Sequence, residues 1–152
     1  MVFNETQVSL TVGETQIISR LIEGQYPDYN QIIPTEFRMN VKTEKSALVS
    51  ALKTVAVFSQ STKSVKFDFL ESGQKIVLTA ESSDLGKSNV ELPAVVTGGD
   101  ATLILNYNYV LDCLSCIDSQ NIMVKIIDDN SPSLIVPEEK KDYMYLVMPI
   151  KS

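Results

Sequence analysis

Apolar and polar residues alternate along the start of the chain, as they do in a half-buried β-strand. Val8, Leu10 and Val12 are separated by polar residues. After a Gly-Glu turn, a second extended run follows over residues 16–22, and residues 26–34 predict an extended linker. Two strands alone do not form a stable sheet in water, so this segment is expected to pack on further protein.

From residue 37 the pattern predicts one strand, one helix and then three strands. Residues 37–42 form the expected first strand, and apolar residues at helical spacing predict a helix over residues 44–59 with Thr43 as its N-cap. The buried face of this helix is predicted at Ala47, Leu48, Ala51, Leu52, Val55 and Phe58. The three strands that follow are marked by alternating positions at Val65, Phe67, Phe69, Ile76, Leu78, Ala80, Ser88, Val90 and Leu92.

The second half of the chain repeats this order after a joint at residues 98–100. A strand over residues 102–105 precedes a helix that Asn106 or Asn108 would cap. Three further strands are expected at residues 122–127, 133–136 and 143–148. The pattern therefore predicts an α+β domain with two helices side by side on a mostly antiparallel sheet, built as a pseudo-duplicated βαβββ unit.

Charge and composition exclude several classes of protein. Thirteen basic residues face 19 acidic ones, for a net charge of −6, which disfavours tight binding to nucleic acid through phosphate contacts. A protein that only encloses DNA needs few such contacts. Histidine is absent, and with it the commonest general base and zinc ligand. No apolar run is long enough to span a bilayer, and the start lacks a signal-peptide pattern, so we expect a cytoplasmic protein.

Few residues offer a basis for catalysis or metal binding. Cys113 and Cys116 form a CxxC, but within a predicted helix and beside acidic residues, where the thiols gain no cationic support. Two small, half-buried helix residues are the favoured interpretation, and a thiol oxidoreductase is the alternative. The acidic run at residues 128–131 lacks the glycine and glutamate of a calcium loop. We expect no enzyme activity, no metal and no cofactor.

Two segments carry a specific resemblance. They are the terminal YLVMPIKS, residues 145–152, and SRLIEGQYPDYNQIIP, residues 19–34. Together, in this order and spacing, they resemble the bacterial DNA polymerase III beta sliding clamp, over nearly the whole chain but only over the family's carboxy-terminal part. The resemblance implies a sliding-clamp fold, with residues 1–34 as a remnant of the middle clamp domain and its linker, and residues 35–152 as the C-terminal domain.

In that family both segments line a hydrophobic pocket that binds short peptide motifs. The positions that match the pocket are Pro27, Gln31, Ile32, Asn106, Tyr109, Pro132, Ser133, Leu146, Met148, Pro149, Ile150 and Lys151. Gln31 stands where some members have arginine, and Lys151 belongs to an ending that is more often arginine. These departures would shift partner preference without removing the pocket.

The resemblance also assigns an interface and a function. Val57 and Phe58 match the subunit interface, and Lys53 is a candidate for the DNA-facing side. Full-length members have three domains and form a head-to-tail homodimeric ring around double-stranded DNA. This chain would lack the first domain and most of the second, which predicts an incomplete pocket and no ring.

The resemblance therefore implies a non-catalytic processivity factor in the bacterial cytoplasm at the replication fork. Its partners would be DNA polymerase, clamp-loader and repair proteins that bind through short linear motifs. An alternative is a natural short clamp product that competes with the full-length clamp for these partners.

Overall fold

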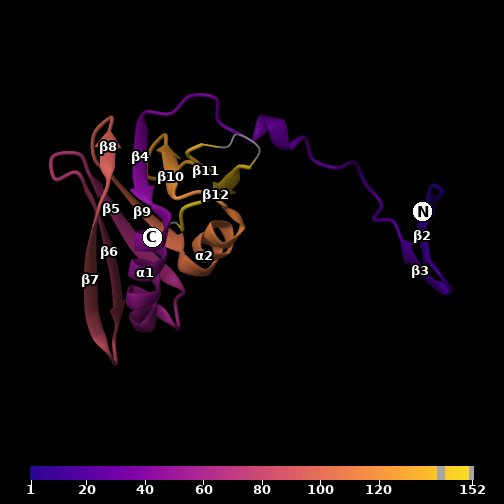
Figure 1. Ribbon diagram of the computed structural model, residues 1–152, viewed down its shortest axis with the longest axis horizontal. Helices are drawn as coiled ribbons and strands as arrows, with labels where there is room; N and C mark the ends of the chain where they lie inside the picture. The colour runs from indigo at the N-terminus through magenta and orange to yellow at the C-terminus, as the bar shows by residue number, and fades with distance from the viewer. Residues whose placement is uncertain (140–142, 151–152) are drawn as a thin grey trace. The chain divides into compact units, whose positions relative to one another are not determined.

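The computed structural model describes residues 1–139 and 143–150, which form two compact units. The first unit is Met1–Ile32 and the second is Ile33–Ser152, so the division falls two residues before the predicted boundary at residue 34. Figure 1 labels the elements of both units.

The first unit is a small antiparallel sheet without a core. Its strands, in the order β1-β2-β3, are Val2–Phe3, Gln7–Val12 and Thr15–Arg20. A short 3₁₀ helix, η1 (Tyr29–Gln31), lies within the segment predicted as an extended linker. None of the residues in this unit is buried, as expected for strands that need further protein to pack on.

The second unit contains two antiparallel sheets and two helices (Figure 1). One sheet has the order β12-β11-β10-β4-β8, formed by Tyr145–Val147, Ser133–Pro137, Asn121–Ile126, Met39–Glu44 and Val95–Thr97. The other has the order β7-β6-β5-β9, formed by Gly86–Pro93, Lys75–Ser82, Ser64–Leu70 and Ala101–Asn106. The helices are α1 (Lys45–Ala56), continued by the 3₁₀ helix η2 (Val57–Ser59), and α2 (Tyr107–Cys116).

The two halves of this unit exchange their first strands. β4, which precedes α1, pairs with β10 of the second half, and β9, which precedes α2, pairs with β5 of the first half. α1 packs against α2 and against β6 and β7, while α2 packs against β9 and β12. The predicted βαβββ repeat is confirmed by the element order, but the halves interlock into two sheets, where one sheet was expected.

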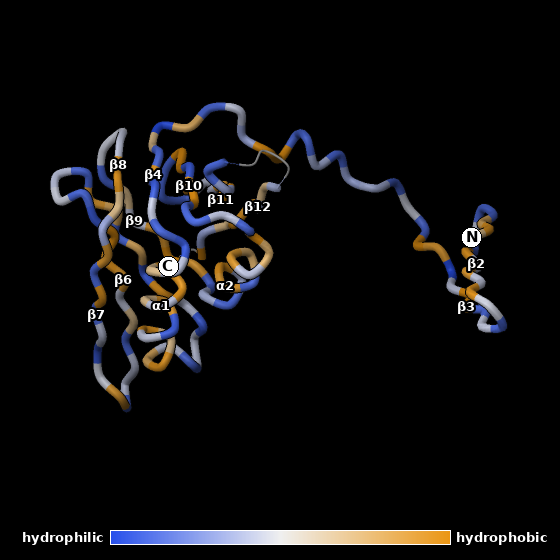
Figure 2. Tube along the Cα trace, viewed as in Figure 1, coloured by the Kyte–Doolittle hydropathy of each residue, from blue (hydrophilic) through white to orange (hydrophobic). Residues whose placement is uncertain are grey.

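One hydrophobic core holds this unit together. Along β5, β6 and β10, buried residues alternate with less buried ones, and the buried side chains form the core. Figure 2 shows apolar residues within β6 and β10. The predicted helix face is buried at Leu48, Ala51, Leu52 and Val55, while Ala47 and Phe58 are half-buried at its margin. Each fully buried leucine or valine side chain stabilises the fold by about 1.5–3 kcal/mol.

The start of α1 differs from the prediction. Thr43 lies in β4 and is buried, and its hydroxyl donates to the Pro93 carbonyl 3.0 Å away, so it does not cap the helix. Glu44 holds the N-cap position without a side-chain hydrogen bond. At α2, Asn106 is the cap, since its side chain accepts from the Asn108 amide at 3.0 Å.

Candidate functional site

The end of the chain forms an apolar wall at the edge of the five-stranded sheet. β12 pairs with β11, with Ser133 opposite Val147 and Leu134 opposite Leu146. Val147 is buried in the core, whereas Met148 is 55% exposed and Leu146 is half-buried on the opposite face of the strand. Successive residues of a strand point to opposite faces, so Leu146 points away from the core that holds Val147. Met148 and Ile150 are thus exposed apolar side chains, and their role as a pocket wall stays a prediction.

A backbone hydrogen bond holds the last described residues beside the start of α2. The amide of Ile150 donates to the carbonyl of Ile104 in β9 at 2.7 Å. β9 leads directly into the cap Asn106 and the helix α2, on which Tyr109 is 57% exposed. The structure therefore brings the second half's helix start and the chain's end to one edge of the unit.

The remaining predicted pocket residues have different settings. Pro132 and Pro149 are half-buried. Ser133 is wholly buried, and its hydroxyl has no hydrogen-bond partner within the described residues. Its side chain therefore does not reach the surface, because the register places it on the core face of β11 opposite Val147. Lys151 lies outside the described residues.

Three predicted pocket residues belong to the first unit. Pro27, Gln31 and Ile32 are all exposed, and they flank or end the helix η1. Asp28 caps this helix by accepting from the Asn30 amide at 3.1 Å, and its second carboxylate oxygen accepts from the Gln31 side chain at 3.2 Å. Gln31 is thus held within its own turn.

The two cysteines lie on α2, near Tyr143. Cys113 is buried and Cys116 is exposed. Burial, opposed by a hydrogen bond with Tyr143, raises the pKa of the Cys113 thiol to about 12. Burial and these same thiols also raise the pKa of Tyr143 to about 12. A thiol that stays protonated is a poor nucleophile, so the arrangement argues against thiol–disulfide chemistry at this CxxC.

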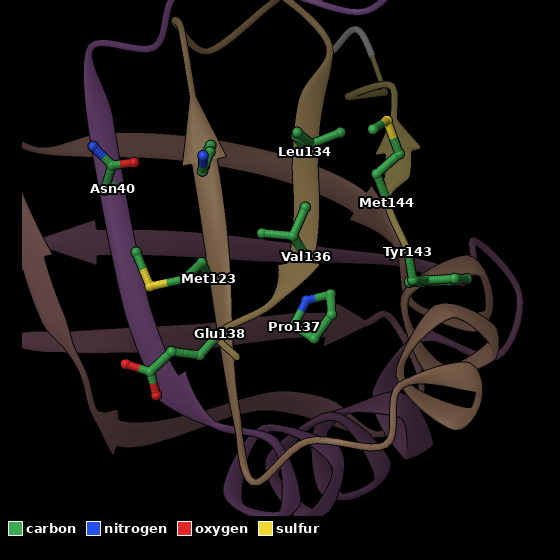
Figure 3. A pocket seen from close by; sticks show the side chains of 9 residues that line it. Asn40, Met123, Leu134, Val136, Pro137, Glu138, Tyr143 and Met144 are labelled. Atoms are coloured by element: carbon green, nitrogen blue, oxygen red, sulfur yellow. The ribbon is translucent and has the colours of Figure 1, made fainter. Parts of the chain in front are cut away.

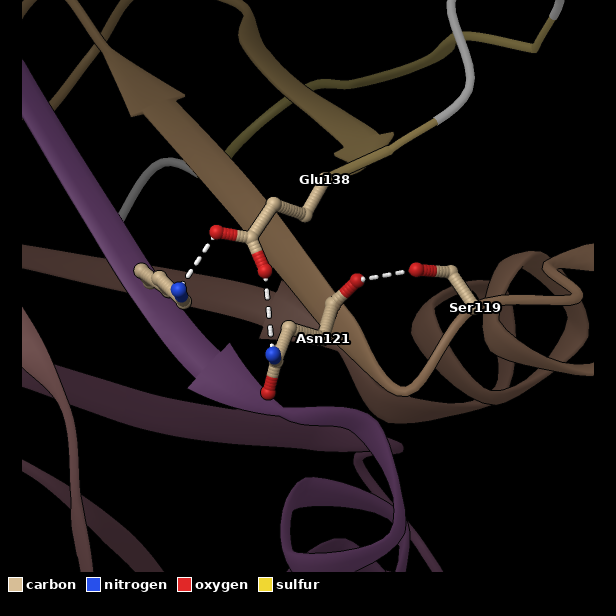
Figure 4. Close-up of polar contacts among 4 residues, drawn as sticks. Ser119, Asn121 and Glu138 are labelled. Atoms are coloured by element: carbon tan, nitrogen blue, oxygen red, sulfur yellow. Dashed lines mark hydrogen bonds and ion pairs between the residues drawn. The ribbon is translucent and has the colours of Figure 1, made fainter.

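A network of polar side chains lies at one end of the five-stranded sheet (Figure 4). Glu138 forms an ion pair with Lys42 of β4 and accepts from the Asn121 side chain at 2.9 Å. These two contacts, chiefly the one with Lys42, hold the pKa of Glu138 below its ordinary value. The hydroxyl of Ser119 donates to the Asn121 carbonyl at 2.8 Å. The network ties β4, β10 and the end of β11 together.

The residues predicted for the interface and for DNA lie on or just after α1. Val57 is 49% exposed at the start of η2, whereas Phe58 is half-buried and packs on the core. Lys53 is exposed and lines a shallow depression between the two helices, together with Lys45 and Ser50. Lys45 is already engaged, because its ammonium donates to the Ile117 carbonyl at 2.6 Å.

Sequence reasoning missed a groove on the outer face of the five-stranded sheet (Figure 3). It has a volume of about 540 Å³, and its floor is formed by Met123, Leu134 and Val136, with Met144 beside them. Alternation along each strand marks these residues as outward, but only the register between strands shows that they meet.

The described part of the chain contains no helix long and apolar enough to cross a membrane. Within the same described residues, the Cys, Asp and Glu side chains form no group of three that could hold a metal ion.

Two helices backed by interlocked antiparallel sheets define an α+β domain, and sliding clamps of solved structure share this fold. The family described as "DNA polymerase III beta subunit, C-terminal domain" matches residues 30–151, and the chain belongs to this family.

Known relatives agree with this assignment. The Beta sliding clamp of Synechocystis is 32% identical to this chain over 152 residues, which are 99% of the chain and 39% of the relative. The crystal structure of the DNA polymerase III beta subunit of Thermotoga maritima is 30% identical, with a TM-score of 0.87. That of Streptococcus pneumoniae TIGR4 is 26% identical, with the same TM-score. The chain covers 41% of each solved structure, so it spans about two fifths of the length of its relatives.

Proposed function

We propose that this chain provides the peptide-binding end of a sliding clamp, a non-catalytic processivity factor that tethers replication proteins to DNA. The observation that carries the proposal is the exposed apolar wall formed by Met148 and Ile150, where the Ile150 amide is hydrogen-bonded to β9, the strand that leads into α2. Apolar side chains that are exposed close together offer a surface that a ligand can cover.

The wall is suited to short linear motifs. One or two apolar side chains of a bound peptide would cover Met148 and Ile150, and each contributes ~1.5–3 kcal/mol when fully buried. After the cost of ordering the peptide, a few such contacts give a dissociation constant on the order of micromolar. Methionine is unbranched and polarisable, so one wall can accept several partners in turn. DNA polymerase, clamp-loader and repair proteins of the bacterial cytoplasm are the proposed partners.

The domain boundaries follow from the same proposal. Residues 1–34 would supply the last strands of the middle clamp domain and the linker, and residues 35–152 the C-terminal domain. The coreless sheet of the first unit supports this, because its strands bury no side chain of their own. Pro27, Gln31 and Ile32 would belong to that linker.

In the full-length protein we propose a homodimeric ring around double-stranded DNA. The exposed Val57 would contact the partner subunit, with the half-buried Phe58 supporting it from the core. Lys53, on the exposed side of α1, would face DNA. The net charge of −6 is compatible with a ring that encloses DNA without binding it tightly.

Peptide titration with a matched pair of variants tests the wall. A fluorescent apolar motif peptide is expected to bind saturably, and Met148→Ala should weaken binding about five- to thirty-fold, the equivalent of about 1–2 kcal/mol. Leu85→Ala removes an equally exposed apolar side chain in the β6–β7 turn and should leave binding unchanged. Equal losses in both variants, or no saturable binding by folded protein, would contradict the proposal.

A further inference from the structure

The strand register arranges the outward side chains of the five-stranded sheet in rows. Lys125 of β10 lies opposite Asn40 on one side and opposite Leu134 on the other, and Leu134 lies opposite Leu146 of β12. One continuous row therefore crosses four strands in the order Asn40, Lys125, Leu134, Leu146. This row runs from Leu146, two residues before Met148 of the proposed wall, to Asn40 of β4.

The neighbouring row makes the surface a groove. Met123 lies opposite Val136 and Lys42, and with Leu134 and Met144 it lines the cavity of about 540 Å³ (Figure 3). The floor is mostly apolar where the groove meets β11 and β12. Its far side is polar, because Asn40 and Glu138 also line it. The groove is therefore apolar near β12 and polar near β4.

Lys125 gives the groove an available positive charge. Its ammonium lies 5.6 Å from the centroid of the Phe37 ring, and among the described residues it takes part in none of the ion pairs. The carboxylate of Glu138, at the other end, is already paired with Lys42. The side chain of Lys125 is half-buried, so a carboxylate placed against it would be partly shielded from water.

We propose that this groove extends the peptide-binding surface, and that it binds an acidic residue that flanks the partner's apolar motif. The inference rests on the proposed function. Lys125 is two strands away from Leu146, roughly 10 Å at the usual spacing of about 4.8 Å between strands. An extended peptide covers that span in about three residues, at roughly 3.3 Å each. The occupant is therefore a peptide with a carboxylate about three positions beyond the motif, and an apolar residue between them.

The test compares peptides that differ by one atom group. In one pair of peptides the motif is extended by three residues at its N-terminal side, and in a second pair at its C-terminal side. Within each pair the outermost added residue is Asp or its uncharged match Asn. Each is titrated against the unchanged chain, Lys125→Gln and the control Lys87→Gln, an exposed lysine on β7. On one side of the motif, the Asp peptide should bind about threefold more tightly than the Asn peptide, as for a partly exposed ion pair. Lys125→Gln should abolish that preference, and Lys87→Gln should keep it.

The short motif peptide separates this inference from the function on which it rests. If the short peptide binds in a Met148-dependent way but Asp and Asn peptides bind equally, the extension is wrong and the wall stands. A preference for Asp that survives in Lys125→Gln also overturns the extension. If neither short nor long peptides bind the folded chain, both proposals fall. Lys125→Glu supplies a second check, since it should reverse the preference in favour of a peptide that ends in Lys.

Discussion

Cys113 and Cys116 are three residues apart on one helix and should differ sharply in reactivity. With a pKa of about 12, the Cys113 thiol is ionised in only about one molecule in ten thousand at pH 8, and it is buried as well. Cys116 is exposed. A thiol reagent that absorbs on reaction should therefore label one cysteine quickly in the native protein and the second only on unfolding.

Two variants make this prediction specific. Cys116→Ser should remove the fast phase, and Cys113→Ser should leave it in place. Rapid labelling of both cysteines in the native state would mean that the helix does not protect Cys113, and it would revive the thiol-enzyme interpretation.

Single residues show how far sequence predicted the site. Burial of the α1 face follows from helical spacing and is found. Met148 and Tyr109 were assigned to the pocket by resemblance; both side chains are exposed, and the assignment stays a prediction. Ser133 was expected in the pocket and is buried, because alternation from Leu134 and Val147 decides its face. The sequence alone did not single out Lys125. Its place in the groove depends on Leu134 and Leu146, which are 9 and 21 residues away along the chain.

At the scale of elements, the glycine at the joint between the halves is the most demanding position. Gly98 has a φ of +96°, and a Cβ there would lie 2.1 Å from the Arg38 carbonyl oxygen, a backbone atom that cannot move aside cheaply. Gly86 has a similar φ of +85° but open space around it. The two glycines therefore separate backbone strain from a steric clash.

Replacement by alanine should show this difference. Gly86→Ala should lower the free energy of unfolding by about 1–2 kcal/mol, because alanine is strained in the left-handed conformation. Gly98→Ala should lower it by about 3 kcal/mol or more, because β4 must also shift. Denaturant unfolding of both variants measures the two losses. Equal losses would mean that the joint between the halves can relax without disturbing β4.

The order of elements was predictable, but their pairing was not. Hydrophobic spacing located both helices and most strands of the second unit within a few residues. It missed the short β1 and β8, which offer too few residues for a period to be seen. The exchange of β4 and β9 between the halves is a tertiary choice that alternation along one strand does not encode.

At the scale of the whole molecule, the chain combines a cored unit with a sheet that has no buried residue. It spans about two fifths of the length of its relatives, so ring formation and DNA enclosure belong to the proposal for the longer protein. The proposed peptide-binding wall can be tested directly in this chain. Its residues Met148 and Ile150 belong to the second unit, which has its own core.

The five methionines offer the most direct measurement of that wall. In a spectrum of methyl-labelled methionine, a short apolar motif peptide should shift the signal of the exposed Met148. The signals of Met1, in the first unit, and Met39, which is fully buried, should stay in place. Met123 and Met144, in the groove, should respond fully only to the extended acidic peptide. A bound peptide that leaves Met148 unchanged, while another methionine shifts, would contradict the account.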